Sequence, residues 1–358
     1  MPSFRNATYY SVKSNVLPRG LNCVSEPPLQ SGVSTGVTGR TIVAVRPGDD
    51  GMEAVTRSDP VTVEEPLEIR IDDEQLTVVM RTPGNDFDLV AGFLLTEGIV
   101  VDPAHLGALT YCATTTPPNE RNVVDVRLAP AARFDADKLR RNFYATSSCG
   151  VCGKASIDQV KMQSQRQATQ FTVTEQVLAD LPDSLRQAQA QFERTGSLHA
   201  AGLFDATGRM LALREDVGRH NAVDKLVGSF VLDGEWPPSA SVLMVSGRTS
   251  FEIVQKALLA GLGFIASVSG PSSLAVDLAD EGGLTLVGFL RHGSYNLYTH
   301  TGRLLRCPAQ PTTEAHMAGF TRPAARGRLQ PSMVENQCVA KGTRPNASTR
   351  SAPKVMSS

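Results

Sequence analysis

The 358-residue sequence lacks any apolar run close to the roughly 20 residues that a membrane-spanning helix needs, so we expect no membrane association. The first forty residues have no continuous apolar core behind their basic residues, and we therefore expect no signal peptide. Cysteine is scarce, with six residues in the chain, which argues against the disulfide framework of small secreted proteins. Together these absences favour a globular protein of the reduced cytoplasm.

Charge is nearly balanced at a net −1, but it is unevenly distributed along the chain. From Thr301 onward, nine lysines and arginines stand against two glutamates. The same stretch is rich in Pro, Ser, Thr and Ala and has no apolar periodicity, which predicts a disordered basic tail over residues 307–358. Disorder explains this composition better than nucleic-acid binding does, so we expect no nucleic-acid partner.

Apolar periodicity divides the remaining chain into parts. Residues 1–56 are rich in Ser, Gly, Pro and Thr, and we interpret them as an irregular N-terminal extension. Residues 57–145 form a smaller α+β portion, in which Leu67, Ile69 and Ile71 alternate with polar residues as in a hairpin with one buried face. A helix over 87–95 and a strand over 124–128 follow, and residues 146–170 are expected to be a mobile cysteine loop and a short helix.

Residues 171–306 carry the most regular pattern. After a helix at 183–194, we expect a hairpin at 200–204 and 210–213, then helices near 222–230, 251–259 and 274–279 that alternate with buried strands at 241–245, 264–268 and 284–290. This order predicts an α/β fold whose mixed sheet has helical crossovers.

The most unusual stretch is Thr146–Lys154, which reads TSSCGVCGK. Cys149 and Cys152 are separated by two residues, and such a pair suits a dithiol redox couple, half of a zinc site, or a thiolate that carries sulfur. All three need the thiolate, which Lys154 and glycine-exposed backbone N–H groups would favour.

Two of these chemistries fit the chain less well. A nucleobase deaminase places a His-x-Glu element before Pro-Cys-x-x-Cys, whereas here Ser148 precedes Cys149 and His199 comes later and is followed by alanines. A structural zinc needs two further ligands, and Cys112 and Cys307 have no paired partners, so we expect no metal. For a thioredoxin-like couple, the strand at 124–128 lies too far upstream.

Three polar loops follow predicted strands, where α/β proteins bind ligands. They are 214–221 (REDVGRHN), 246–250 (SGRTS) and 289–294 (FLRHGS). The Gly, Ser and Arg residues of the second loop suit an anion at a helix N-terminus, although an ion-pair cluster or a simple turn would explain the first and third. Together the loops suggest a ligand with several negative charges, of which a nucleotide is the obvious class.

Four motifs carry a family resemblance: RTPGNDFDLVAGFLLTEG at 81–98, TSSCGVCGKASI at 146–157, REDVGRHNAVDK at 214–225 and SGRTSFEIVQK at 246–256. In order and spacing, from about Val61 to Arg306, the sequence resembles the formate dehydrogenase accessory sulfurtransferases, the FdhD family. The resemblance implies a cytosolic homodimeric sulfur carrier with a cytidine-deaminase-like core that lacks the zinc site. It also implies a cysteine desulfurase as sulfur donor and formate dehydrogenase as recipient.

The resemblance further assigns roles by position. Cys149 matches the persulfide-bearing cysteine, and Cys152 is its companion, either as a resolving thiol or as a group that tunes Cys149. The segment Phe289, Leu290, Arg291, His292, Gly293 and Ser294 matches the part that contacts the molybdenum bis(molybdopterin guanine dinucleotide) acceptor. The two pyrophosphates of that acceptor would explain why Arg214, Arg219, Arg248 and Arg291 converge, and GDP-like nucleotides would then bind the same place. The alternatives are a CxxC dithiol oxidoreductase and a zinc-stabilised nucleotide-binding module.

Overall fold

The computed structural model describes residues 36–49, 51–116, 119–130, 132, 171–236 and 240–306. The cysteine segment at 146–154, the short helix expected after it and the basic tail at 307–358 lie outside the described residues. Among the residues described, no helix combines the length and the apolar character needed to cross a membrane.

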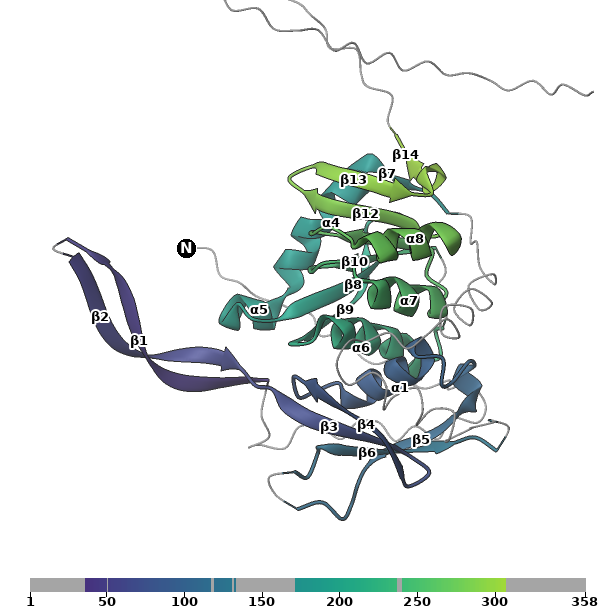
Figure 1. The fold of residues 1–358 in the computed structure, drawn as a ribbon, viewed down its shortest axis with the longest axis horizontal. Coiled ribbons are helices and arrows are strands. Elements are labelled where there is room, and N and C mark those ends of the chain that lie inside the picture. The colour runs from purple at the N-terminus through teal and green to yellow at the C-terminus, as the bar shows by residue number, and fades with distance from the viewer. Residues whose placement is uncertain are drawn as a thin grey trace, which may run out of the picture. The chain divides into compact units, whose positions relative to one another are not determined.

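A mixed six-stranded sheet forms the centre of the α/β core, as the sequence predicts (Figure 1). Its strand order is β13-β12-β11-β10-β8-β9, and β10, β11 and β12 are parallel, while β8, β9 and β13 run antiparallel to their neighbours. The strands are β8 (His199–Asp205), β9 (Met210–Asp216), β10 (Ser241–Val245), β11 (Phe264–Ser267), β12 (Thr285–Arg291) and β13 (Ser294–Thr299).

Helices cover both faces of this sheet because its strands present apolar residues in both directions. Leu243, Ile265 and Leu286 belong to the cluster that contains the helices α6 (Arg219–Leu232), α7 (Phe251–Leu259) and α8 (Ser273–Glu281). The alternate positions Val242, Met244 and Val287 belong to the cluster of α4 (Glu175–Ala188). The single helix expected at 183–194 is divided at Gln189 into α4 and α5 (Ala190–Thr195).

The N-terminal portion is a four-stranded sheet of order β4-β3-β6-β5, with α1 (Asp86–Thr96) packed on one face. Its strands are β3 (Glu65–Ile71), β4 (Glu74–Arg81), β5 (Leu106–Tyr111), which follows the short helix η1 (Pro103–His105), and β6 (Val123–Leu128). The hairpin β3–β4 and the strand β6 confirm the sequence prediction, and Leu67, Ile69 and Ile71 are fully buried on the α1 side. The short pair β7 (Val173–Thr174) and β14 (Leu304–Leu305), the latter preceded by η2 (Thr301–Arg303), completes the described elements.

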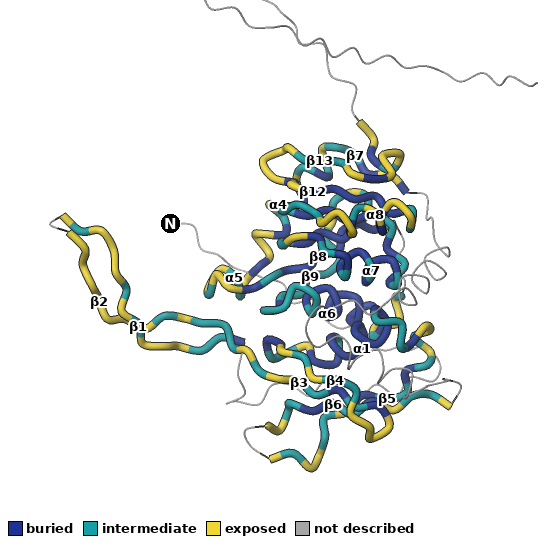
Figure 2. The backbone as a smooth tube through the Cα atoms, viewed as in Figure 1, coloured by how far each residue is buried: buried dark blue, intermediate teal, exposed yellow. Residues whose placement is uncertain are grey.

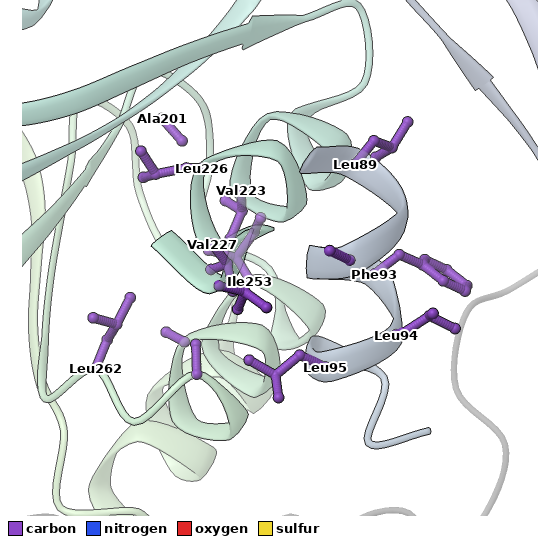
Figure 3. Packing of buried hydrophobic residues seen from close by; sticks show 14 of the residues in the cluster. Leu89, Phe93, Leu94, Leu95, Ala201, Val223, Leu226, Val227, Ile253 and Leu262 are labelled. Atoms are coloured by element: carbon purple, nitrogen blue, oxygen red, sulfur yellow. The ribbon is translucent and has the colours of Figure 1, made fainter. Parts of the chain in front are cut away.

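Helix α1 connects this portion to the α/β core through an unusually close contact with α6. A Cβ placed on Gly92 would lie 1.8 Å from the carbonyl oxygen of Asp224, and one placed on Gly228 would lie 1.8 Å from that of Asp88. The missing side chains therefore let the two backbones approach. Around this contact, Leu95 of α1, Val227 of α6 and Ile253 of α7 contribute to one continuous apolar cluster (Figure 3).

Part of the predicted irregular extension is wrong. Strands β1 (Val37–Gly48) and β2 (Gly51–Thr62) pair along their whole length in an antiparallel hairpin that precedes β3. Although residues 1–56 are rich in Ser, Gly, Pro and Thr, they include Val43 and Val45 at alternating positions. Valine is β-branched and therefore favours strands.

The third loop is a turn, which is one of the two interpretations that the sequence leaves open. Residues 291–294 turn from β12 into the additional strand β13, which the sequence does not predict. His292 and Gly293 both have positive φ, at 51° and 73°, which is the backbone of a two-residue hairpin turn. Strand β13 could not be recognised from the sequence, because its residues are mostly exposed and lack the apolar run that marks β12.

Candidate functional site

The first two predicted loops meet at one edge of the six-stranded sheet. The carboxyl end of β10 lies beside the start of β8, where Ser246 Oγ accepts a hydrogen bond from Ala200 N at 2.9 Å. Because β9 is antiparallel to β8, its last residue Asp216 pairs with His199 at the same edge. The N-termini of α6 and α7 therefore open side by side, as expected for ligand sites of α/β sheets.

Polar residues from three elements gather at this edge. A Cβ placed on Gly247 would lie 3.2 Å from His199 Nδ1 and 4.0 Å from Arg219 Cδ, so glycine leaves room for both side chains. On α6, His220 Nε2 is 3.3 Å from Ser250 Oγ, the residue that precedes α7. We call this group the edge cluster. Its members are His199, Arg219, His220, Arg248, Thr249 and Ser250.

The two histidines of the edge cluster are held in their neutral form. Burial lowers the pKa of His199, and the nearby charges of Arg219 and Arg248 lower it further. Burial and the Lys256 and Arg219 charges lower the pKa of His220 to about 4. At neutral pH, Arg219 and Arg248 therefore supply the positive charge, while each imidazole offers one hydrogen-bond donor and one acceptor.

Two hydrogen-bonding groups of the edge cluster lack a partner. Arg219 Nε and Thr249 Oγ1 are both buried and make no hydrogen bond in the described part of the chain. Thr249 is also completely inaccessible to solvent, so water cannot satisfy its hydroxyl. An unsatisfied buried polar group costs about 1–3 kcal/mol, so such groups mark places where a ligand would complete the bonding.

The helix N-termini add further donors at the same place. Neither Gly218 before α6 nor Ser250 before α7 caps its helix with a side chain. At α7 the Glu252 carboxylate, in the first turn, accepts a hydrogen bond from its own backbone N–H. The dipoles of both helices favour negative charge at this edge. The arrangement can bind phosphate or another oxyanion.

Arg214, a predicted ligand, instead forms an ion pair between the two parts of the fold. Its Nε and Nη2 atoms both lie 2.8 Å from Asp88 Oδ2 on α1. Burial raises the pKa of Asp88, and the Arg214 charge opposes that rise. The next residue, Glu215, accepts hydrogen bonds from the backbone N–H groups of Gln191 and Phe192 at the start of α5. Both contacts favour a structural role for this part of the motif.

Other charged residues of the shared motifs form buried ion pairs that join the N-terminal portion to the core. Asp216 Oδ2 is 2.7 Å from Lys225 Nζ, and the same oxygen accepts a hydrogen bond from Thr82 N at 3.1 Å. Asp224 Oδ2 is 2.9 Å from Lys256 Nζ on α7. We call these two pairs, together with Asp88–Arg214, the junction pairs.

The third predicted segment, residues 289–294, lies at the end of β12 and is not part of the edge cluster. The Phe289 ring is exposed and packs over Gly270, where a Cβ would lie 2.6 Å from Phe289 Cζ. The segment after Gly270 returns to the edge cluster, because Pro271 bridges Thr249 and Ser272 N donates to Thr249 O at 3.0 Å.

The remaining residues of that segment have mixed surroundings. Leu290 is fully buried in the apolar cluster under α4, which favours a packing role. Arg291, His292, Gly293 and Ser294 are exposed around the hairpin turn, and Ser294 Oγ donates to Arg291 O at 2.9 Å. The arginine side chain is thus free to contact a ligand from solvent.

Cys149 and Cys152 lie outside the described residues. Within the described ranges, no group of three or more His, Cys, Asp and Glu side chains is arranged to hold a metal ion. The sequence did not predict that His199 or Thr249 takes part in the site. Nothing in the apolar pattern marks a histidine at the first position of β8, because its neighbours Arg219 and Gly247 are distant in the chain.

Comparisons with known proteins agree on one family. A model of the FdhD/NarQ family matches residues 62–305. A Streptomyces coelicolor protein named sulfur carrier protein FdhD is 51% identical over 270 residues, which cover 74% of this chain and 94% of the relative. The Mycobacterium tuberculosis protein of the same name is 51% identical over 259 residues, covering 70% and 94%.

A solved structure shares the fold. The crystal structure of a putative formate dehydrogenase accessory protein from Desulfotalea psychrophila aligns with a TM-score of 0.58 and 23% sequence identity. The alignment covers 75% of this chain and 99% of that protein.

Proposed function

Because this chain belongs to the FdhD/NarQ family, we propose that it is a sulfur carrier that matures formate dehydrogenase. The identity of about half over nearly the whole length of relatives named sulfur carriers is the observation that carries this proposal. The paired cysteines of the TSSCGVCGK motif supply the thiols that such a carrier needs.

In the proposed reaction, Cys149 receives sulfur by substitution at sulfur. Its thiolate attacks the outer sulfur of a persulfide on a cysteine desulfurase, and the donor cysteine leaves as a thiolate. One S–S bond forms as another breaks, so the transfer needs no added oxidant or reductant. Lys154 favours the attacking anion, and Cys152 acts as a resolving thiol or tunes its neighbour.

The acceptor in this proposal is molybdenum bis(molybdopterin guanine dinucleotide), which is a substrate of the carrier. The edge cluster fits its pyrophosphates, because Arg219 Nε and Thr249 Oγ1 have no hydrogen-bond partner among the described residues and the N-termini of α6 and α7 open beside them. Arg248 and Arg291 are exposed and would contact the outer phosphates. GDP carries the same diphosphate and is therefore a suitable probe.

The proposal includes several finer features. The carrier would act in the cytoplasm as a homodimer, take sulfur from a cysteine desulfurase and serve formate dehydrogenase as recipient. Its core would be related to the cytidine deaminases without their zinc site. The mixed sheet with helices on both faces is compatible with that relationship.

Intact mass spectrometry after incubation with a cysteine desulfurase and free cysteine tests the sulfur-carrier function. We expect a gain of one sulfur atom that peptide mapping places on Cys149. Cys149→Ala should lose this gain and fail to support formate dehydrogenase activity, while its circular dichroism spectrum stays unchanged. Cys152→Ala is the matched control and should still take up sulfur. A Cys149→Ala protein with full persulfide uptake would refute the proposal.

The two alternatives give different results in the same experiment. A dithiol oxidoreductase would show loss of two hydrogens through a Cys149–Cys152 disulfide and would not bind GDP. A zinc-stabilised module would retain stoichiometric metal after purification without chelators.

A further inference from the structure

The first turn of α7 carries a carboxylate beside the edge cluster. Helix α7 is buried over most of its length (Figure 2), but the side chain of Glu252 in its first turn is 29% exposed. Glu252 Oε2 lies 3.9 Å from Nε2 of His220, a member of the edge cluster. Because the proposed function uses this place for a phosphate, a negative side chain here calls for a physical explanation.

The groups around Glu252 are those that suit an anion. The Glu252 carboxylate accepts hydrogen bonds from its own backbone N–H and from the Ser250 hydroxyl, and Arg219 adds positive charge. A phosphate at a helix N-terminus uses the same kinds of partner, namely a backbone N–H, a hydroxyl and a guanidinium. The carboxylate therefore has the surroundings that an oxyanion of the ligand would have.

Glu252 is ionised at neutral pH. Burial raises the pKa of its carboxyl group, but the hydrogen bonds from Ser250 and from its own N–H, together with the Arg219 charge, outweigh burial and bring the pKa below its ordinary value. His220 does not cancel this negative charge, because its own pKa of about 4 leaves the imidazole neutral. The ligand-free protein thus holds a full negative charge next to the edge cluster.

The N-terminus of α6 differs from that of α7. Its first turn contains no acidic residue, whereas the first turn of α7 contains Glu252. Asp216 also lies close to the α6 end, where it accepts a hydrogen bond from Gly218 N, but its charge is matched by Lys225 at 2.7 Å. Among the described residues, no lysine or arginine forms an ion pair with Glu252. At the α7 end, the carboxylate is therefore held by hydrogen bonds that a ligand could take over.

We propose that Glu252 is the affinity-determining residue of the edge cluster, because its carboxylate occupies the anion position at α7 until the diphosphate of the ligand replaces it. The inference rests on the proposed function, which puts a diphosphate at this place. In the exchange, the Ser250 hydroxyl and the first N–H groups of α7 donate to a phosphate oxygen instead of Glu252. The displaced side chain, which is already partly exposed, turns towards solvent.

Such an exchange suits a protein that has to release its ligand. The new hydrogen bonds to phosphate replace similar bonds to Glu252, so the α7 end adds little net affinity. The displaced carboxylate also stays close enough to repel the phosphates. Both effects weaken binding and speed dissociation, and a carrier that passes its ligand to another protein depends on dissociation.

Calorimetry with GDP tests this role of Glu252. Glu252→Gln keeps the size of the side chain and removes its charge, so we expect GDP to bind about tenfold more tightly than it binds the wild type. The gain should increase with the charge of the ligand, from no change for guanosine through GMP to GDP.

Glu235→Gln is the matched control. Glu235 is exposed and follows the opposite end of α6, so this variant removes the same charge from the protein at a distance from the edge cluster. Its affinity for GDP should equal that of the wild type. Thermal melting of both variants checks that the fold is retained.

The outcomes separate this inference from the proposed function. Unchanged GDP affinity in Glu252→Gln, or an equal gain for guanosine and GDP, overturns the inference and leaves the edge cluster as a GDP site. Weaker GDP binding also overturns it, since the carboxylate would then accept hydrogen bonds from the ligand. Failure of both proteins to bind GDP overturns the inference together with the diphosphate site. Persulfide uptake by Cys149 is measured independently and bears only on the sulfur-carrier function.

Discussion

The junction pairs and the edge cluster come from the same sequence motifs but occupy opposite environments. In REDVGRHNAVDK, Asp216 and Lys225 are buried and paired with each other, whereas Arg219, three residues after Asp216, has a buried Nε without a hydrogen-bond partner in the described ranges. In SGRTSFEIVQK, Lys256 pairs with Asp224, whereas the Thr249 hydroxyl makes no hydrogen bond to any residue that the structure describes. A charged residue in a motif therefore indicates a ligand only when the fold leaves it unsatisfied.

The environments also predict different costs of change. Replacing a junction residue leaves a buried charge unpaired, which destabilises the fold and affects function only indirectly. An edge-cluster residue makes few hydrogen bonds in the ligand-free protein, so replacing it should change ligand affinity more than stability. The following variants test this division.

The largest effect is expected at the helix contact that holds the junction together. Gly228→Ala would place a Cβ 1.8 Å from the backbone oxygen of Asp88, which neither helix can avoid without moving. We expect a loss of more than about 4 kcal/mol in unfolding free energy, measured by urea denaturation. Gly302→Ala is the control, because a Cβ there meets no atom within 4 Å. Equal stability of the two variants would refute the close contact.

Lys256→Met should have the next largest effect, about 3–4 kcal/mol, because it leaves the Asp224 carboxylate buried without its cation. Arg194→Met on the exposed face of α5 is the control and should change stability by less than about 0.5 kcal/mol. Urea denaturation measures both variants.

The same variant has a defined pH dependence. Burial already raises the pKa of Asp224 to about 6, although Lys256 opposes the rise, and loss of that cation would raise it further. A carboxyl group whose folded pKa is raised binds a proton in the folded state, which relieves the penalty as the pH falls through that value. The stability difference between Lys256→Met and the wild type should therefore be larger at pH 8 than at pH 5.5. Equal differences at both pH values would contradict this account.

The smallest effects on stability are expected when two arginines of one motif are replaced separately. This pair of variants directly tests the distinction between edge-cluster and junction residues. Arg219→Gln should weaken GDP binding by about tenfold in calorimetry, or about 1.4 kcal/mol, with little change in unfolding free energy. Arg214→Gln should lower stability by about 2 kcal/mol through loss of the Asp88 pair and leave GDP affinity nearly unchanged. The reverse pattern would show that the two arginines have been assigned the wrong roles.

Much of the fold could be predicted from apolar periodicity. The helix at 251–259 begins and ends as expected, and Leu67, Ile69 and Ile71 form the predicted buried face of β3, because these segments alternate clearly between apolar and polar residues. The same alternation of Leu76, Val78 and Met80 in β4 predicts the wrong face, since Val78 and Met80 are exposed. Strand β13 was missed because it is mostly exposed and thus lacks a buried face to signal it. The hairpin β1–β2 was missed for a related reason, since its apolar residues face solvent within this chain.

The candidate site could be predicted only in part. The sequence alone identified the loops at 214–221 and 246–250, because strand, turn and helix succeed one another there in a recognisable order. Arg214 could not be distinguished from Arg219 by sequence, since the partner of Arg214 lies on α1, more than a hundred residues earlier.

By itself, the sequence determined the α/β class, the family and the cysteine pair, because these depend on local periodicity and on motifs read along the chain. Only the tertiary structure decided which motif charges are paired and which remain available. Pairing depends on contacts between distant segments, such as Asp224 with Lys256 and His199 with the loop at Gly247, and burial makes each contact energetically decisive.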